Sequence, residues 1–163
     1  HVSKIAMFKI NRKIEYALIS LKHMSCKKPD ALTSAKEICD VYHTPFDPTS
    51  RVLQIMAQHK ILHAEQGVKG GYRIIRDLNK LKLLELSDMI VGPIEIAGCF
   101  HGNYSHCGIN SVCQIISPML NLNDQIREVF GDMSVAHLLK GRHQSEKAIQ
   151  RKEFKQTTES VSA

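Results

Sequence analysis

Three cysteines fall within fifteen residues near the middle of the chain, in the polar stretch GCFHGNYSHCGINSVC. They are Cys99, Cys107 and Cys113, with seven and then five residues between them. Thiolates are soft ligands for zinc and for iron–sulfur clusters. The chain has five cysteines, so they cannot all pair as disulfides, and clustered thiols in a reducing compartment more often hold metal or do redox chemistry. The spacing therefore predicts a metal or redox site on a loop.

Three chemistries are open for this loop. An iron–sulfur cluster usually takes four ligands, so three thiolates leave one position for another donor, and His101 and His106 are candidates within the loop. Zinc held by the three cysteines and His106 is the second, because Cys₃His is a common structural zinc set, although no C-x2-C knuckle is present. A metal-free thiol or disulfide sensor is the third. A thiol nucleophile at Cys107 is not expected, because the stretch lacks the context of such a site.

The positive charge of the chain is concentrated in its first half. Residues 1–80 hold 14 lysines and arginines against 7 acidic residues, whereas residues 81–163 hold 8 against 9. The basic half is the candidate for contact with a polyanion. No apolar run approaches the roughly 20 residues of a membrane-spanning helix, and the N-terminus does not resemble a secretory signal. We therefore expect a cytoplasmic protein without a membrane partner.

Two amphipathic helices are predicted near the N-terminus. Asn11 serves as N-cap for a helix over residues 11–24. Ser34 and Glu37 have the spacing of a capping box at the start of a second helix, residues 33–43. The apolar side chains expected to face the core are Ile14, Ala17, Leu18 and Leu21 in the first helix and Ala35, Ile38 and Val41 in the second.

The turn TPFDPTS separates the second helix from a third one. Pro48 is expected to open this helix at the position where proline costs least, with Asp47 as its cap. Val52, Leu53 and Met56 should then face inward. A short helix, a tight turn and a second helix form the helix-turn-helix arrangement, in which the later helix enters the major groove of DNA.

A β-hairpin is predicted directly after the third helix, in the stretch ILHAEQGVKGGYRII. Its loop contains Gly67, Gly70 and Gly71, which permit positive φ and a close approach of the backbone to another molecule. Lys69 at the tip, with Arg73 behind it, suits contact with phosphates or a narrow minor groove. A hairpin in this place is a wing, so the expected fold class is mainly α with a small β-hairpin wing.

The second half is predicted to contain a short helix over residues 82–91, stopped at Gly92-Pro93, and a long helix that begins at Ser117-Pro118. Apolar residues of the long helix recur at spacings of three and four over about two heptads. Such a seam packs on the core of its own domain or on a twin helix in a symmetric dimer. The seam consists of Met119, Leu122, Ile126, Val129 and Met133.

Three regions follow from these patterns. Residues 7–80 are predicted to form a winged helix-turn-helix domain, and residues 81–140 the cysteine loop and the long helix. The family resemblance given next implies that these are a DNA-binding domain and a cluster-binding loop with a dimerisation helix. Residues 141–163 are polar, mixed in charge and poor in large apolar side chains, which is typical of a disordered tail. Met7 is a candidate start of the native chain, because the sequence begins with His1.

In their order along the chain, these features resemble one family of bacterial regulators. FKINRKIEYAL, the helix pair, KGGYRI and a three-cysteine loop before a long helix are similar to the IscR/NsrR/RirA family (the Rrf-two family) over roughly residues 7–140. The spacing C-x7-C-x5-C resembles the RirA branch, whereas IscR and NsrR have five residues in the first gap. The resemblance implies a winged-helix homodimer that binds palindromic operators in double-stranded DNA and, in many members, carries an iron–sulfur cluster.

The resemblance also implies how the cluster would be completed. The fourth ligand can be a carboxylate at the Glu15 position, supplied by the first helix of the partner subunit. IscR-like members have a histidine three residues after the last cysteine, where this chain has Ile116. We therefore rank an iron–sulfur cluster, with two or four irons, above zinc and above bare thiols. The expected function is a regulator whose operator affinity is switched by a cluster that senses iron, redox state or nitric oxide. The alternative is a zinc-bound or thiol-redox winged-helix regulator.

The DNA contacts implied by the resemblance lie on the third helix and the wing. Ser50 and Arg51 match the positions that read base edges in the major groove, and Arg51 favours guanine. Thr49 and the helix N-terminus would anchor a phosphate. The wing, Gln66 to Gly71, would lie in or beside the minor groove, although many relatives have arginine at the Gln66 position.

Overall fold

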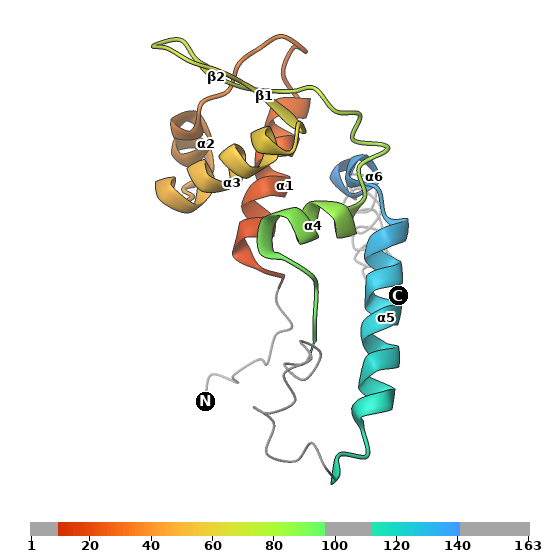
Figure 1. The fold of residues 1–163 in the computed structure, drawn as a ribbon. Coiled ribbons are helices and arrows are strands. Elements are labelled where there is room, and N and C mark those ends of the chain that lie inside the picture. The colour runs from red at the N-terminus through yellow and green to blue at the C-terminus, as the bar shows by residue number, and fades with distance from the viewer. Residues whose placement is uncertain (1–9, 97–111, 141–163) are drawn as a thin grey trace, which may run out of the picture.

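Six helices and one β-hairpin make up the described part of the chain, residues 10–96 and 112–140, in a computed structural model (Figure 1). The predicted tail and four candidate ligands, Cys99, His101, His106 and Cys107, lie outside the described residues. The first three helices are α1 (Arg12–Ser25), α2 (Ala35–Tyr42) and α3 (Phe46–Gln58). The hairpin strands β1 (Leu62–Glu65) and β2 (Gly71–Ile74) precede α4 (Leu83–Val91), α5 (Ile116–Asp132) and α6 (Val135–Lys140).

The first two helices begin where the sequence predicts. The Asn11 side chain accepts a hydrogen bond from the Lys13 N–H (3.0 Å) at the start of α1. The Ser34 hydroxyl accepts one from the Glu37 N–H (3.1 Å) at the start of α2. These bonds satisfy backbone donors that have no partner inside the helix. The reciprocal half of the predicted capping box is absent among the described contacts, because the Glu37 carboxylate instead binds Lys27 and His23.

The predicted start of α3 is wrong by two residues. The helix begins at Phe46, with Pro45 at the N-cap position, and no side chain caps it. The Thr49 N–H donates to the Pro45 carbonyl, which closes the first turn before Asp47 could act as cap. Pro48 is tolerated as the third helical residue, because N–H groups in the first turn have no helical acceptor.

One apolar core joins α1, α3 and α4 with β1 and α6. Val52, Leu53 and Met56 are fully buried, as the sequence predicts. On α2 the prediction holds for Ile38 but is wrong for Val41, which is 54% exposed. Ile38 is the one fully buried residue of this short helix, and the last turn, with Val41 and Tyr42, faces solvent. The core is thus built mainly on α1, α3 and α4.

The hairpin is held against the helices by a third segment of chain. β1 and β2 pair antiparallel, with Leu62 opposite Ile74 and Glu65 opposite Gly71. On the other side of β2, Thr33 and Tyr72 exchange two backbone hydrogen bonds of 2.9 Å. A Cβ on Gly71 would lie 2.9 Å from the Thr33 carbonyl oxygen, so only glycine fits this close approach.

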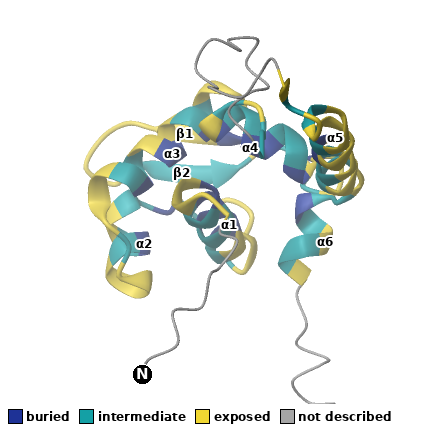
Figure 2. Ribbon diagram, turned by 90° about the horizontal axis from the view of Figure 1, so that it is seen from below, coloured by how far each residue is buried: buried dark blue, intermediate teal, exposed yellow. Residues whose placement is uncertain are grey.

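The long helix α5 lies along one side of the molecule and extends away from the helix-turn-helix (Figures 1 and 2). It begins at Ile116 with Ile115 at the N-cap position, so the predicted start, with Ser117 as N-cap and Pro118 as first helical residue, is wrong by two residues. Its C-terminal end is tied to the body by backbone bonds, from the Leu83 N–H to the Met133 carbonyl (2.9 Å) and from the Val135 N–H to the Leu81 carbonyl (2.8 Å). None of the helices in the described ranges is both long and apolar enough to cross a membrane.

Candidate nucleic-acid interface and the ends of the cysteine loop

One face of α3 is turned to solvent, and it carries the predicted base-reading residues. Side chains four apart lie on the same side of a helix, and this spacing connects Ser50 and Arg51 to three further positions. We call this set the reading face. Four members are exposed and Ser50 is partly exposed, whereas the opposite side of the helix packs on the core. The reading face consists of Phe46, Asp47, Ser50, Arg51 and Gln54.

The reading face presents varied hydrogen-bonding chemistry. Within residues 10–96 and 112–140, Arg51 makes no ion pair and Gln54 makes no side-chain hydrogen bond. Arginine can pair with two acceptors of guanine, and glutamine with an acceptor and a donor of adenine. The sequence reasoning did not include Phe46, Asp47 or Gln54 in the site. Helical spacing from Ser50 and Arg51 was the signal that could have found them.

Thr49, predicted to anchor a phosphate, requires a correction. Its side chain is fully buried. The hydroxyl donates to the Pro45 carbonyl (2.8 Å) and lies 3.0 Å from the Thr44 hydroxyl. Both contacts hold the turn between α2 and α3 against the start of α3. Thr49 therefore positions the reading face and has no surface left for a phosphate.

The tip of the wing is fully open to solvent. Gln66 and Lys69 are exposed, and Lys69 makes no ion pair with any described residue. Gly67 has a φ of 111°, and a Cβ on Gly70 would meet the Glu65 carbonyl oxygen at 2.2 Å, so the tight loop needs glycine at both positions.

Arg73, further from the tip of the wing, differs from Lys69 because it has acidic partners. Its Nε lies 3.7 Å from Glu65 Oε1, and its Nη1 lies 3.9 Å from Asp30 Oδ1. These loose ion pairs offset part of its charge. Lys69 is therefore the stronger candidate of the two for a phosphate contact.

A polar cluster that the sequence did not reveal ties the helix-turn-helix to the wing. Glu37 Oε1 lies 2.7 Å from both Lys27 Nζ and His23 Nε2. Since the carboxylate can only accept here, His23 carries a proton on Nε2. Lys27 Nζ also donates to the Leu32 carbonyl and to the Thr33 hydroxyl, each at 3.0 Å. Because Thr33 pairs with β2, this cluster connects α1, α2 and the wing.

Glu37 has a lowered pKa in this cluster. Burial of the carboxyl group raises its pKa, but the hydrogen bonds and the charges of Lys27 and His23 outweigh burial, and the pKa falls below its ordinary value of 4.5. The carboxylate is therefore ionised throughout the neutral range and binds its two partners as an anion.

Both ends of the cysteine loop are attached to α5. On the side that enters the loop, the Ile96 N–H donates to Asn123 Oδ1 (3.2 Å), and the Asn123 side chain is buried. On the side that leaves it, Cys113 is partly buried three residues before α5. Asn123 was not singled out from the sequence, since a lone asparagine on a helix carries no distinguishing pattern.

Glu15 lies on the first turn of α1 and forms an ion pair with Arg12 (2.7 Å). The described residues contain no cluster of three or more potential metal ligands, and of the predicted ligands only Cys113 and Glu15 belong to them. A mostly apolar cavity of about 370 Å³ separates the first turn of α1 from α5. Its lining residues are Ile10, Asn11, Ile14, Val91, Pro93, Ile94, Glu95, Ile96, Ile126 and Phe130.

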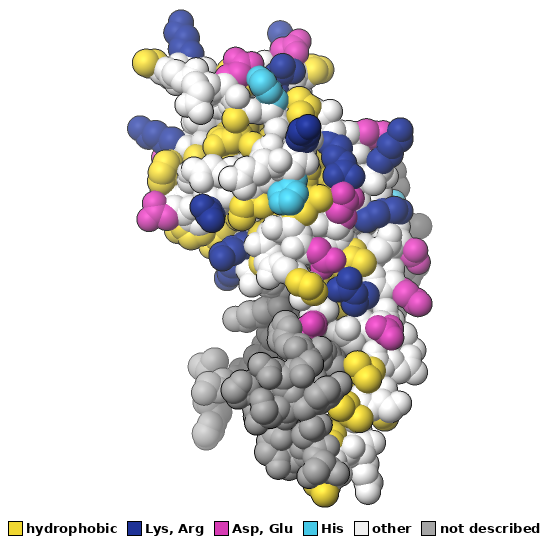
Figure 3. All heavy atoms as spheres, viewed as in Figure 1, with side chains coloured by type: hydrophobic (Ala, Val, Ile, Leu, Met, Phe, Trp, Pro, Cys, Tyr) yellow, Lys and Arg dark blue, Asp and Glu magenta, His cyan; other side chains and the backbone are white. Residues whose placement is uncertain are grey.

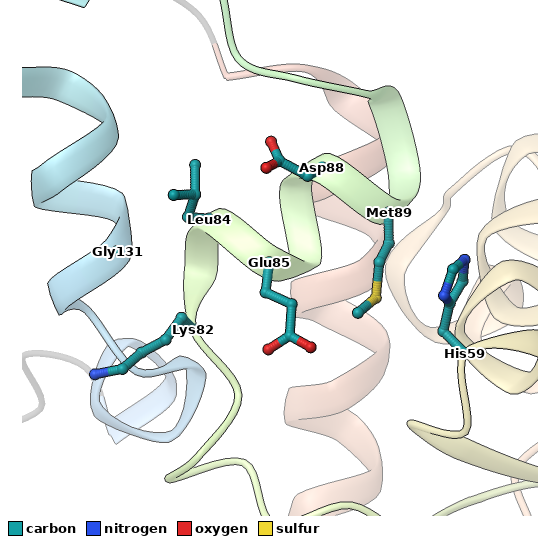
Figure 4. A pocket seen from close by; sticks show the side chains of 7 residues that line it. All are labelled: His59, Lys82, Leu84, Glu85, Asp88, Met89 and Gly131. Carbon is teal, nitrogen blue, oxygen red and sulfur yellow. The ribbon is translucent and has the colours of Figure 1, made fainter. Parts of the chain in front are cut away.

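A second, open cavity of about 580 Å³ lies along α4 (Figure 4). Its two acidic side chains already have partners, since Glu85 pairs with Arg76 at 2.7 Å and Asp88 with Arg127 at 3.3 Å. The lining is otherwise largely apolar. It consists of His59, Lys82, Leu84, Glu85, Asp88, Met89 and Gly131.

The surface divides into a region rich in charged groups and an apolar one. Figure 3 shows Lys and Arg side chains spread over the helix-turn-helix and the wing, whereas apolar side chains follow the lower part of α5. Three exposed apolar residues, which we call the apolar stripe, lie seven positions apart from the N-cap of α5 to its last turns. They are Ile115 (60% exposed), Leu122 (45%) and Val129 (58%).

Comparison with known proteins identifies the family. The family model described as Rrf2, iron-dependent transcriptional regulator, matches residues 10–141, which is most of the chain. The chain belongs to the Rrf2 family. Two curated relatives of this Rrf2 protein are both named HTH-type transcriptional regulator NsrR. The one from Shouchella clausii is 20% identical over 101 residues, covering 62% of this chain and 68% of the relative. The one from Bacillus subtilis is 24% identical over 105 residues, covering 64% and 72%.

Solved structures agree on the fold of this Rrf2 chain. CymR, the global cysteine regulator of B. subtilis, superposes with a TM-score of 0.60 at 16% identity, covering 82% of this chain and 98% of CymR. T. potens IscR gives a TM-score of 0.58 at 16% identity, covering 85% and 90%. The resemblance inferred from the sequence and the winged-helix fold class are both confirmed. The protein is an Rrf2-family transcriptional regulator and not an enzyme.

The polar cluster makes a testable prediction about stability. We expect Glu37→Gln to lower the free energy of unfolding by about 1–2 kcal/mol at neutral pH, because Lys27 loses its charged acceptor. A carboxyl group whose pKa is lowered in the folded state stabilises the fold above its unfolded pKa, and this contribution is lost as the pH falls through the folded pKa. The difference between variant and wild type should therefore shrink below about pH 4.5 in urea titrations.

Glu128→Gln on α5 is the matched control, because Glu128 is exposed and makes no ion pair within the described ranges. It should change the unfolding free energy by less than about 0.5 kcal/mol at every pH. A Glu37→Gln penalty that stays constant from pH 7 to pH 3 would contradict the assignment.

Proposed function

We propose that the protein is a homodimeric, operator-binding regulator that reads DNA with α3 and the wing and senses its signal through an iron–sulfur cluster on the cysteine loop. The observation that carries the DNA-binding part is the reading face, an unpaired polar surface on the helix that precedes a wing. In helix-turn-helix proteins the second helix lies in the major groove with its N-terminal residues against base edges. Four of the five reading-face residues fall in the first two turns of α3.

The wing supports the same proposal from the other side. Lys69 is an exposed cation at the tip of a tight glycine loop, and such a cation can release counterions by binding a phosphate. In this proposal Arg51 reads a base in the major groove, while Gln66 to Gly71 contact the backbone or the minor groove. Phosphate contacts would set the position on the duplex and base contacts would set its sequence preference.

Replacing Arg51 or Lys69 by alanine should weaken DNA binding in different ways. Operators would be selected from randomised duplexes with the wild-type protein and then altered one base pair at a time. We expect Arg51→Ala to relax the preference at one base pair in each half-site by about 1–3 kcal/mol. Lys69→Ala should weaken binding to all sequences alike and lower the salt slope by about 1. Unchanged base preference in Arg51→Ala would show that α3 is not the reading helix.

The apolar stripe supports assembly of two copies through α5. Leu122 and Val129 of α5, with Ile115 at its N-cap, lie seven residues apart, so they would form a straight line along a supercoiled helix and fit against the same line on a twin. The rest of the predicted seam, Met119, Ile126 and Met133, is partly buried against its own subunit. A twofold axis along this stripe would place two reading faces on one palindromic operator.

A lysine in the apolar stripe should separate the proposed dimer. We expect the wild-type protein to sediment as a dimer and Val129→Lys as a monomer at micromolar concentration, because an unpaired ammonium buried in an apolar interface costs several kcal/mol. Asp124→Lys, on the polar side of the same helix, should remain dimeric. A monomeric wild type, or a dimeric Val129→Lys, would exclude α5 as the dimer contact.

The residues proposed to hold a cluster are Cys99, Cys107 and Cys113, with Glu15 of the partner subunit as fourth ligand. Two observations fit this assignment. Cys113 is a free, partly buried thiol on a loop whose two ends are fixed to α5, and Glu15 is partly exposed with one surface ion pair to give up. A cluster supplies reactivity toward small oxidants or nitric oxide, and a carboxylate ligand exchanges more easily than a thiolate.

The route from the loop to DNA passes through α4. This helix packs on α1, α3 and α5, and Arg76 and Arg127 hold it by ion pairs at two points. A shift at the ends of the loop would therefore reach the reading face through packed side chains. A differential free energy of ~1–3 kcal/mol between two arrangements would change operator affinity by about 5–150-fold.

Metal content tests the cluster directly. Protein purified without oxygen should be coloured and contain iron with acid-labile sulfide, and Cys113→Ala should lose most of both. Cys26→Ala is the control, since it removes an exposed thiol outside the loop and should retain them. Glu15→Ala should keep the fold and shorten the lifetime of the bound iron. Stoichiometric zinc without sulfide would favour the zinc alternative, and neither metal would favour a thiol sensor.

A further inference from the structure

Phe46 is an exposed aromatic residue in an unusual place. It is the first residue of α3, it is 54% exposed, and it is not among the apolar residues that pack on the core. It lies four residues before Ser50, so the ring is on the reading face and not on the side toward α1. The fold therefore places a large apolar side chain where the proposed function places the base edges.

The turn before α3 keeps Phe46 in this position. His43 has a φ of 54° and ends α2, and the Thr49 hydroxyl and N–H both bond to the Pro45 carbonyl. Tyr42 is engaged with His23. Its hydroxyl lies 3.2 Å from His23 Nδ1, and the Tyr42 and His23 rings meet edge to face. The bonds to the Pro45 carbonyl fix the backbone at the start of α3, and the Phe46 side chain remains 54% exposed there.

We propose that Phe46 is a specificity-determining residue that covers the 5-methyl group of a thymine in the major groove. The methyl group of thymine is the apolar feature among the base edges of that groove, and phenylalanine is one of the side chains that contact it. Arg51, five residues on, favours guanine, so the pair would select thymine near guanine in each half-site. This inference rests on the proposed DNA-binding function.

A contact with another protein is the competing occupant of this surface. Two observations favour DNA. The flanking reading-face groups, Ser50, Arg51 and Gln54, are polar donors and acceptors, whereas an apolar protein contact would need apolar neighbours on this face of α3. The chain also offers a separate apolar surface for a second copy, the stripe on α5.

Replacing thymine by deoxyuridine removes only the methyl group and so tests the contact. In an operator selected by the wild-type protein, each thymine would be replaced in turn. We expect one position per half-site at which wild-type affinity falls about threefold to tenfold. Phe46→Ala should lose a similar factor on the unmodified operator and lose nothing more on the deoxyuridine duplex. Arg51→Ala should stay sensitive to the same methyl group.

The outcomes separate the inference from the function beneath it. Failure of the wild-type protein to select any duplex would overturn the proposed function. Selective binding that ignores every deoxyuridine, or selection of an operator without thymine in its half-sites, would overturn the role of Phe46 and leave DNA binding intact. If Phe46→Ala binds the thymine operator and the deoxyuridine operator more weakly than wild type by the same factor, the ring contacts the DNA backbone or a protein and not the methyl group. Thermal unfolding of Phe46→Ala should match wild type, because the ring is not part of the core.

Discussion

Burial of one face of α4 is the constraint on which the rest of the structure depends. Leu86 and Ile90 lose nearly all their exposure and join buried residues of α1 and α3 in one cluster, so α4 belongs to the same core as the helix-turn-helix. This core fixes α3 from behind and turns its polar side outward. On its other side α4 contacts α5, and backbone bonds between the residue pairs 83–133 and 81–135 close the arrangement. One buried helix therefore joins the proposed DNA surface to the proposed sensor.

The ion pairs around α4 fix its orientation within this packing. Glu85 forms an ion pair with Arg76, which follows the wing, and Asp88 forms one with Arg127 of α5. Partly exposed pairs of this kind contribute little to stability, typically less than about 1 kcal/mol each. They do fix which side of α4 faces the wing and which side faces α5. Specificity of arrangement, more than strength, is what these pairs provide.

Much of the fold could be predicted from the sequence because its signals are local. Apolar spacing, the Asn11 and Ser34 caps and the glycine-rich hairpin all act within a few residues, and each predicted element is present. Proline was a weaker guide, since it is tolerated throughout the first turn of a helix, and Pro48 indicated the right turn but the wrong residue.

The errors arise where distant partners compete with local patterns. Glu37 has the sequence position of a capping residue, but its carboxylate binds His23 of α1 and Lys27, just after α1, in place of the backbone N–H of the cap. Val41 continues the apolar stripe of α2 beyond the point where the core ends. Thr49 was predicted to anchor a phosphate together with the helix N-terminus, yet its hydroxyl donates to the Pro45 carbonyl of the preceding turn. Asn123 carried no sequence signal, and Phe46 could have been found only by its helical spacing from Ser50 on α3.

The charges of the reading face limit how the proposed complex could obtain its affinity. Arg51 is the one cation on this face and Asp47 is its anion, so the five side chains together carry no net charge. A neutral surface gains little from counterion release, and a carboxylate near phosphates is unfavourable unless it accepts a bond from a cytosine amine. Affinity must then come from cations elsewhere in the basic half, with Lys69 on the wing foremost among them. In such an arrangement α3 discriminates between sequences while the wing and its neighbours hold the duplex, and the two properties can be altered separately.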